Sequence, residues 1–171
     1  MDVKEAILHR KSIRKYLGRE VSKETIQELI DAARLAPSAN NIQPSRYLIV
    51  SDADTKMLLR QEKIFVQDFI CTVPVIIVCC TDPVLYKKRS DADISAESKA
   101  VLDLSLASSY LMLRATELGL GTCYIGLMEK EKIKTVLNIP AHMIVPFVIT
   151  VGYAAEDPPK TPLKNIEEIL L

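Results

Sequence analysis

The sequence predicts an α+β fold with three layers, in which helices flank a mixed central sheet. Residues 73–81 form a continuous apolar and β-branched run, which is typical of a central strand buried on both faces. Residues 97–118 form the longest helical pattern and are apolar nearly all round, which predicts a helix buried on all sides. With 171 residues the chain has the length of one domain, and we expect residues 1–171 to form it.

Helical and extended patterns alternate in the first half of the chain. The elements expected there are a helix at 2–10, an extended piece at 12–16, a helix at about 23–36, a strand at 47–50, and a helix from Asp52 or Asp54 to about Gln61. Ser22 is a favourable N-cap for the second helix. Pro37 ends that helix because proline cannot continue it.

The alternation continues in the second half. The elements expected there are the strand at 73–81, the helix at 97–118, a strand at 122–125, a helix at 129–137 and a strand at 144–153. Gly119 and Gly121 end the long helix, and Gly126 ends the short strand after it. The residues Ile166, Ile169 and Leu170 suggest a short packing segment at the end of the chain.

Composition excludes several functional classes. The 22 Lys and Arg residues balance the 22 Asp and Glu residues, so no general charge favours nucleic acid or an anionic membrane. The longest uncharged run, near 72–81, is far shorter than the roughly 20 residues of a membrane helix. The charged N-terminus lacks the apolar core of a signal peptide. We therefore expect a soluble, cytoplasmic protein.

The motifs of several enzyme classes are missing. No GxGxxG follows a strand, and neither a P-loop nor a GxSxG elbow occurs. The 2 histidines and 4 cysteines show no zinc-ligand or triad spacing, and the cysteines are expected to be buried thiols. Carboxylates lie on amphipathic helices, where solvated faces account for them. If the protein is an enzyme, a bound cofactor is expected to carry the chemistry.

Two stretches are suited to binding. The first contains Arg10, Lys11, Ser12 and Arg14. Its guanidinium groups and hydroxyl can converge on a phosphate, although a basic cluster can equally be solvated surface. The second, residues 34–47, is a polar loop stiffened by two prolines. It is either a simple connection or a rigid binding loop.

These stretches resemble motifs of the nitroreductase family of FMN-dependent oxidoreductases. Residues 10–14 (RKSIR) resemble its R-[RK]-S-x-R element, and residues 36–44 (APSANNIQP) resemble its APSxxNxQPW segment, the most specific of the motifs. Residues 119–126 (GLGTCYIG) resemble its GLGxxWxG stretch. The proline-rich tail with Lys160 and Lys164 resembles its closing basic element. The likeness covers nearly the whole chain.

The resemblance implies a homodimer with the long helix at the interface and two FMN sites, each built from both subunits. Arg10 and Ser12 would hold the phosphate and ribityl region, helped by Lys160 or Lys164. Lys11 would contribute mainly through its backbone. Arg14 would reach the N1/C2=O edge of the flavin, where a cation makes reduction easier.

Further contacts are implied from two other places. The other subunit would contribute Pro37, Ser38, Ala39 and Asn41. Ile125 and Gly126 would present backbone to the N5/O4 side of the ring, where the absence of a side chain at Gly126 permits close approach.

The implied activity is transfer of hydride from NAD(P)H to flavin N5, followed by reduction of a nitroaromatic, quinone or similar acceptor in a ping-pong mechanism. No catalytic protein residue is expected, because hydride transfer depends mainly on stacking and orientation. A flavin-binding or redox-sensing module without substantial turnover is the alternative, and a non-redox α+β dimer is a third interpretation. The sequence leaves the acceptor and the choice of NADH or NADPH open.

The chain departs from the family pattern at two positions. Ser45 and Tyr124 stand where tryptophan is common in the family, and the chain contains no tryptophan. Packing at both positions is therefore expected to differ. Residues 62–72, whose secondary structure is ambiguous, and the polar residues 82–96 are expected to act as lids.

Overall fold

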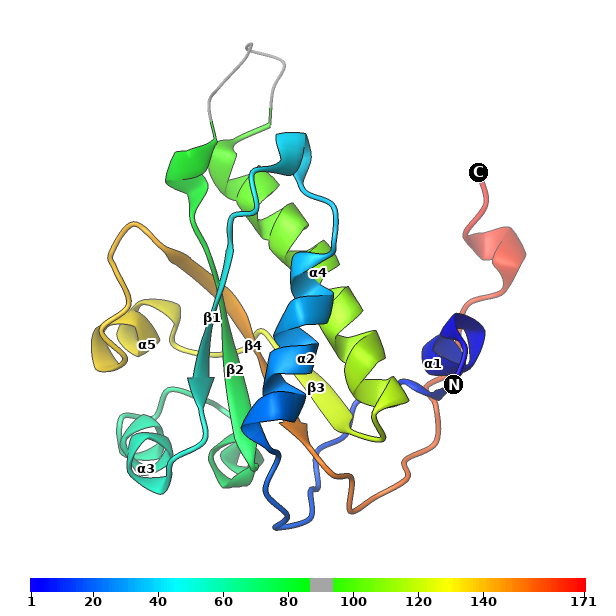
Figure 1. Cartoon of the computed structure of the whole chain (residues 1–171), viewed down its shortest axis with the longest axis horizontal. Coiled ribbons are helices and arrows are strands. Elements are labelled where there is room, and N and C mark those ends of the chain that lie inside the picture. Colours follow the sequence, from blue (N-terminus) through cyan, green and yellow to red (C-terminus); the bar gives the residue numbers. More distant parts are fainter. Residues whose placement is uncertain (87–93) are drawn as a thin grey trace.

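The computed structural model describes residues 1–86 and 94–171, and part of the expected lid at 82–96 therefore lies outside the described residues. The described chain forms a four-stranded sheet between helices (Figure 1). The α+β class predicted from the sequence is confirmed.

The strands are β1 (Ser45–Val50), β2 (Val75–Thr81), β3 (Gly121–Ile125) and β4 (Ile144–Gly152), in the spatial order β1-β2-β4-β3. All three pairings are antiparallel, so the expectation of a mixed sheet is wrong for these strands. A buried apolar run does not reveal strand direction, because helices on both faces produce the same pattern in either kind of sheet. Parallel pairing occurs only as an isolated bridge between Ser12 and Thr122 among the described residues.

The principal helices begin where the sequence predicts. They are α1 (Val3–His9), α2 (Lys23–Arg34), α3 (Ala53–Gln61), α4 (Ala96–Glu117) and α5 (Lys130–Val136). The Ser22 hydroxyl accepts a hydrogen bond from the Thr25 amide at 3.1 Å, and this starts α2. The Asp52 carboxylate accepts from the Thr55 amide at 2.7 Å and starts α3. Part of the ambiguous segment at 62–72 is a short 3₁₀ helix, Asp68–Thr72.

The sheet separates two hydrophobic cores, which explains why every residue of β2 is buried. Ile77 and other odd-numbered residues of β2 face α2 and α4, whereas Ile76 and other even-numbered residues face α3 and α5. Leu29 and Leu104 belong to the first core, and Leu59 belongs to the second. The three-layer arrangement follows from this alternation.

Helix α4 is buried on one side only. Leu104 and Leu111 are fully buried, but Leu102, Leu106 and Tyr110 on another side are 57%, 47% and 44% exposed. The expectation that this helix is buried on all sides is therefore wrong for a single chain. The helix needs to be apolar toward its own sheet, and that requirement leaves the exposed apolar side unexplained.

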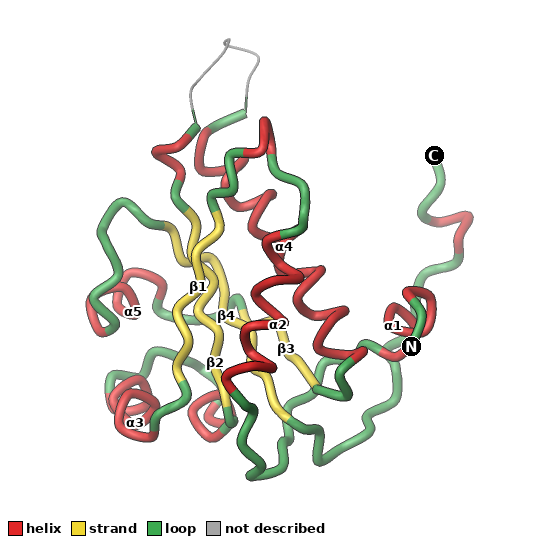
Figure 2. The backbone as a smooth tube through the Cα atoms, in the orientation of Figure 1, coloured by secondary structure: helices red, strands yellow, loops and turns green. Residues whose placement is uncertain are grey.

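The two ends of the chain run beside each other at the edge of the molecule (Figures 1 and 2). In α1 only Ala6 is buried, whereas Val3 and Ile7 are exposed. The expected packing segment at 166–170 is likewise exposed in the single chain. Neither end of the chain therefore joins the two cores.

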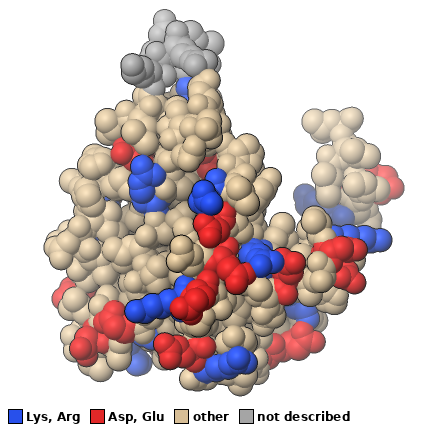
Figure 3. Space-filling view, in the orientation of Figure 1, with Lys and Arg blue, Asp and Glu red and all other residues tan. Residues whose placement is uncertain are grey.

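Charged side chains of both signs are interspersed on the face shown in Figure 3. This mixture agrees with the net charge of zero and leaves no broad single-sign surface on that face. None of the helices in the described part of the chain combines the length and apolarity needed to cross a bilayer.

A substitution at Gly152 tests how tightly the N-terminal segment packs on the sheet. A Cβ atom at this buried position would lie 2.8 Å from Cγ of Pro74 and 2.9 Å from Cδ1 of Tyr16. Because both rings are stiff, we expect Gly152→Ala to lower the free energy of unfolding by about 1–3 kcal/mol. Chemical denaturation at fixed protein concentration measures the loss. Gly18→Ala is the control, because a Cβ at Gly18 meets nothing within 4 Å; equal stability of the two variants would contradict the expectation.

Candidate functional site

The extended segment after α1 places the predicted basic cluster. The Ile13 amide donates to the Thr122 carbonyl at 2.9 Å, and the Ser12–Thr122 bridge continues this contact with β3. Gly121 makes the approach possible, because a Cβ there would lie 2.7 Å from Cγ1 of Ile13. The segment next to the basic side chains is therefore held against the end of the sheet.

Tyr16 fastens the far end of this segment. Its hydroxyl donates to the Ile13 carbonyl at 2.6 Å and lies 2.7 Å from the Thr150 hydroxyl. Burial raises the pKa of Tyr16 well above its usual value, so the phenol stays protonated and remains a hydrogen-bond donor.

Two acidic residues of the tail, Glu156 and Asp157, bond to the same segment. The Glu156 carboxylate accepts from the backbone amides of Arg14 at 2.6 Å and Lys15 at 3.1 Å. The Asp157 carboxylate pairs with the Lys11 ammonium. Because Asp157 is highly exposed, this pair is weak, but it gives the Lys11 side chain a partner other than a ligand.

The structure brings both ends of the chain to one pocket of about 380 Å³. Arg10, Lys11, Ser12 and Arg14 line it together with Lys160 of the tail. Side chains that carry guanidinium, ammonium and hydroxyl groups line it, and none of the described Asp and Glu residues does. This set of donors suits an anion such as a phosphate. Lys164 is exposed and is not among the lining residues.

The predicted loop contacts lie at a different place in the same chain. Pro37 and Ser38 line a second pocket of about 490 Å³, together with Tyr47 and Asp103, and none of the described residues lines both pockets. Ala39 and Asn41 are exposed on the same loop. A single chain therefore does not bring the loop to the basic cluster.

The loop has an unusual backbone. Asn40, Asn41 and Gln43 have φ angles of 52°, 55° and 53°, in the left-handed region. The Ser38 hydroxyl accepts from the Gln43 amide at 2.9 Å, and the Asn41 side chain accepts from the Gln43 side chain at 3.0 Å. Three such residues in four positions require bonds of this kind to hold them.

Ile125 and Gly126 lie at the end of β3. The Ile125 side chain is buried, whereas Gly126 is exposed. A Cβ at Gly126 would meet only the Tyr124 ring, at an ordinary 3.8 Å. The packing of this chain therefore does not require glycine at this position. Tyr124, at one of the positions where the family often has tryptophan, stacks on Phe147 with ring centroids 4.1 Å apart.

Sequence reasoning missed one polar residue at the loop. Asp103 of α4 is only 8% exposed, so the expectation that solvated helix faces account for the carboxylates is wrong at this position. Its Oδ2 atom accepts hydrogen bonds from the Ala39 amide at 2.8 Å and from the Tyr86 hydroxyl at 2.5 Å. The sequence contains a signal for this, because Asp103 lies between Ala100 and Ala107 on the apolar side of the helix.

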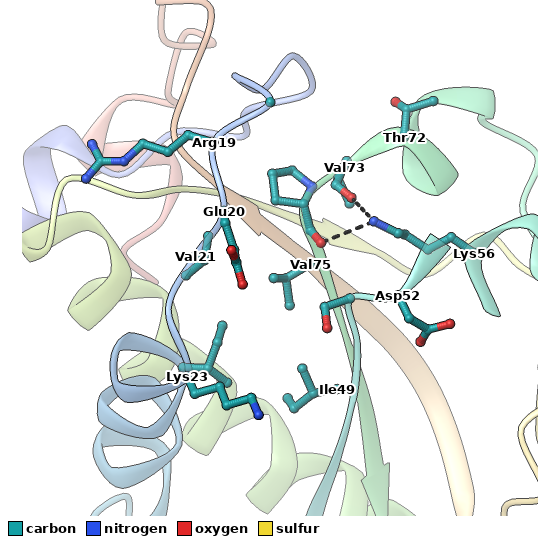
Figure 4. A pocket seen from close by; sticks show the side chains of 14 residues that line it. Arg19, Glu20, Val21, Lys23, Ile49, Asp52, Lys56, Thr72, Val73 and Val75 are labelled. Atoms are coloured by element: carbon teal, nitrogen blue, oxygen red, sulfur yellow. Dashed lines mark hydrogen bonds between the residues drawn. The ribbon is translucent and has the colours of Figure 1, made fainter. Parts of the chain in front are cut away.

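A third pocket, of about 640 Å³, lies away from all the predicted site residues (Figure 4). It is formed by residues 18–23, the end of β1, the start of α3 and residues 72–75. Lys56 borders it, but its ammonium donates to the carbonyls of Val73 and Pro74. Acidic Glu20 and Asp52 also line it, so the pocket lacks the one-sided charge of the basic cluster.

Comparison with known proteins identifies the group to which the chain belongs. Residues 7–65 and 55–153 match the nitroreductase family. A protein of Methanothermobacter thermautotrophicus, provisionally named NADH dehydrogenase/NAD(P)H nitroreductase, is 36% identical over 92% of this chain and 80% of its own length. The FMN reductase (NADPH) of Bacillus subtilis is 28% identical over 92% of this chain and 68% of its own length. A solved nitroreductase family protein of Clostridium difficile is 25% identical, with a TM-score of 0.84 over 100% of this chain and 98% of the other.

These matches agree with one another in extent and in kind. The family match covers most of the chain, and the solved structure shares the α+β arrangement of sheet and helices. The resemblance predicted from the short motifs is thus confirmed, and the chain belongs to the nitroreductase family.

Proposed function

We propose that the protein is an NAD(P)H-dependent oxidoreductase that holds FMN at the Arg10–Arg14 pocket and reduces a nitroaromatic, a quinone or a similar acceptor. Family membership and the relatives named as FMN reductase and NAD(P)H nitroreductase support FMN as cofactor and NAD(P)H as co-substrate. The observation that carries the proposal is the pocket that joins Arg10, Ser12 and Arg14 to Lys160, because these donors suit the phosphate of FMN.

Different residues of this pocket would contact different parts of FMN. Arg10, Ser12 and Lys160 would hold the phosphate and ribityl region, while Arg14 would place positive charge beside the ring edge. Lys164 would act in the surrounding field rather than in contact, because it does not line the pocket. Backbone groups of Ile125 and Gly126 would face the ring.

Bound FMN would supply a ring that accepts hydride from NAD(P)H and passes the reducing equivalents to the acceptor. The protein's part is binding, orientation and charge, and no acid or base of this chain is assigned to the reaction. We propose ping-pong kinetics, in which the oxidised nicotinamide leaves before the acceptor binds. The role of residues 62–72 as a lid and the cytoplasmic location stay predictions.

We also propose that residues 1–171 act as one FMN-binding domain in a homodimer. Two observations support a dimer. The loop with Pro37 and Ser38 does not lie at the basic pocket of its own chain. This is consistent with a loop that contacts the FMN bound by the other subunit. The exposed side of α4, with Leu102, Leu106 and Tyr110, supplies apolar surface for an interface.

Reduction of bound FMN by a nicotinamide is the first test. We expect the purified protein to be yellow or to bind added FMN, and to bleach anaerobically on addition of NADH or NADPH. Absorbance at the flavin bands measures both steps, and a panel of acceptors then measures turnover. If FMN binds but neither NADH nor NADPH reduces it, the flavin-binding module is favoured instead. A protein that does not bind FMN would refute the proposal.

Loss of a pocket cation should weaken FMN binding. Because hydrogen bonds to charged groups contribute about 1.5–3 kcal/mol, we expect Arg10→Ala or Arg14→Ala to raise the FMN dissociation constant roughly tenfold to a hundredfold. Quenching of flavin fluorescence measures the constant. Lys160→Ala should weaken binding more than Lys164→Ala, because only Lys160 lines the pocket. Arg60→Ala on α3 is the control for loss of an exposed arginine, and an equal effect from it would count against the assignment.

A charge on the exposed side of α4 should disrupt the dimer. We expect Leu106→Asp to convert the protein to monomers and to lower FMN affinity with it, because burying an unpaired carboxylate in an interface is costly. Sedimentation velocity measures the first effect and fluorescence quenching the second. Met57→Asp, at a 60% exposed position on α3, is the matched control. A stable monomeric wild type that binds FMN would contradict the shared site.

A further inference from the structure

The buried carboxylate of Asp103 has a role that the flavin pocket does not explain. It projects from the buried side of α4, where Ala100, Leu104 and Ala107 surround it along the helix. A carboxylate in such a place is costly unless hydrogen-bond donors satisfy it. Both donors that reach its Oδ2 atom come from outside the helix, from the Ala39 amide and the Tyr86 hydroxyl.

The bond to Ala39 connects α4 to the polar loop. The other bonds of the loop described above link Ser38, Asn41 and Gln43 to one another. These bonds preserve the shape of the loop. The Ala39 amide is tied instead to a residue 64 positions away, on the longest helix. This bond therefore ties the loop to α4.

Tyr86 completes the carboxylate's environment. Its side chain is 8% exposed, and its hydroxyl lies 2.5 Å from the same oxygen atom that receives the Ala39 amide. Burial and the neighbouring Asp103 raise the pKa of Tyr86 well above its usual value, so the phenol stays protonated and donates. The carboxylate thereby receives two fixed donors and cannot turn freely away from the loop.

The same helix carries the proposed dimer contact. Leu102 and Leu106, on its exposed side, lie close to Asp103 in sequence. Helix α4 therefore both bonds to the loop and carries the surface proposed to face the second subunit. A shift of the loop relative to α4 would therefore move Ser38 and Asn41 relative to the FMN of the other chain.

We propose that Asp103 is a positioning residue, which holds the Ala39 backbone so that the 37–41 loop reaches FMN bound by the partner subunit. The proposal rests on the proposed function, because it assumes that this loop contacts FMN. Asp103 itself touches neither the cofactor nor the substrate in this arrangement. It acts through the main chain of the loop, because the Ala39 backbone amide is the group that it holds.

Two substitutions remove the tie from opposite ends. Asp103→Ala removes the acceptor, and Asp103→Asn keeps one acceptor oxygen for the Ala39 amide. Ala39→Pro removes the donor while leaving Asp103 in place, and the extended Ser38 backbone, with φ of −138° and ψ of 153°, is compatible with a following proline. Leu59→Val, which trims a fully buried side chain in the core on the other face of the sheet, is the control for a general loss of stability.

The first readout is FMN affinity, measured by quenching of flavin fluorescence. We expect Asp103→Ala to raise the dissociation constant at least tenfold, Asp103→Asn to stay within about threefold of wild type, and Leu59→Val to stay within twofold. The double variant Asp103→Ala with Ala39→Pro should bind FMN no worse than the weaker-binding of the two single variants, because each single change already breaks the bond between Ala39 and Asp103. Additive losses, or an Asp103→Ala protein that binds FMN within twofold of wild type, would overturn the proposal.

The second readout needs no cofactor. Hydrogen exchange of the peptide 37–43 in the FMN-free protein should become at least tenfold faster in Asp103→Ala and remain near wild type in Leu59→Val. Unchanged exchange would refute the tie. A wild-type protein that binds no FMN would refute the proposed function, whereas the exchange experiment would still decide whether Asp103 holds the loop.

Discussion

Docking of the extended segment after α1 against the end of the sheet is the constraint on which the candidate site depends. The segment contributes no strand to the sheet, yet its amide at Ile13 bonds to β3 and its Tyr16 hydroxyl reaches Thr150 of β4. Because it is fixed in this way, the side chains of Arg10 and Arg14 emerge at one pocket. The returning tail reaches that pocket beside the same segment, where Glu156 accepts from the backbone amides of Arg14 and Lys15 and the Ala155 amide donates to the Lys15 carbonyl.

Acidic side chains that bond to backbone amides place both parts of the candidate site. Glu156 holds the basic segment, and Asp103 holds the polar loop. The two carboxylates differ in burial, and that difference governs their energetic weight. The hydrogen bonds of Glu156 are exposed and compete with water. At buried Asp103, by contrast, loss of the carboxylate leaves a buried donor unsatisfied. Hydrophobic packing builds the scaffold, and these polar bonds then position the segments attached to it.

Local signals account for the parts of the structure that the sequence predicts well. Ser22 and Asp52 cap helices by bonding to amides three residues away, and the buried run of β2 reflects helices on both faces of the sheet. Strand direction was not predictable, because burial on both faces is compatible with either direction. The sequence overestimated the burial of α4 in a single chain. An apolar residue such as Leu102 suits the protein's own core and the surface of a second molecule equally well, so its type does not tell the two apart.

The sequence by itself determined the family, the helix starts, the buried strand and the identity of the basic residues, because each of these depends on residue types within a few positions. Only the tertiary structure decided that Lys160, not Lys164, joins Arg10 at the pocket, and that Asp103 is buried against the loop. These relations join residues 150 and 64 positions apart. The path of the chain around the sheet brings them together, and no local pattern of residues records that path.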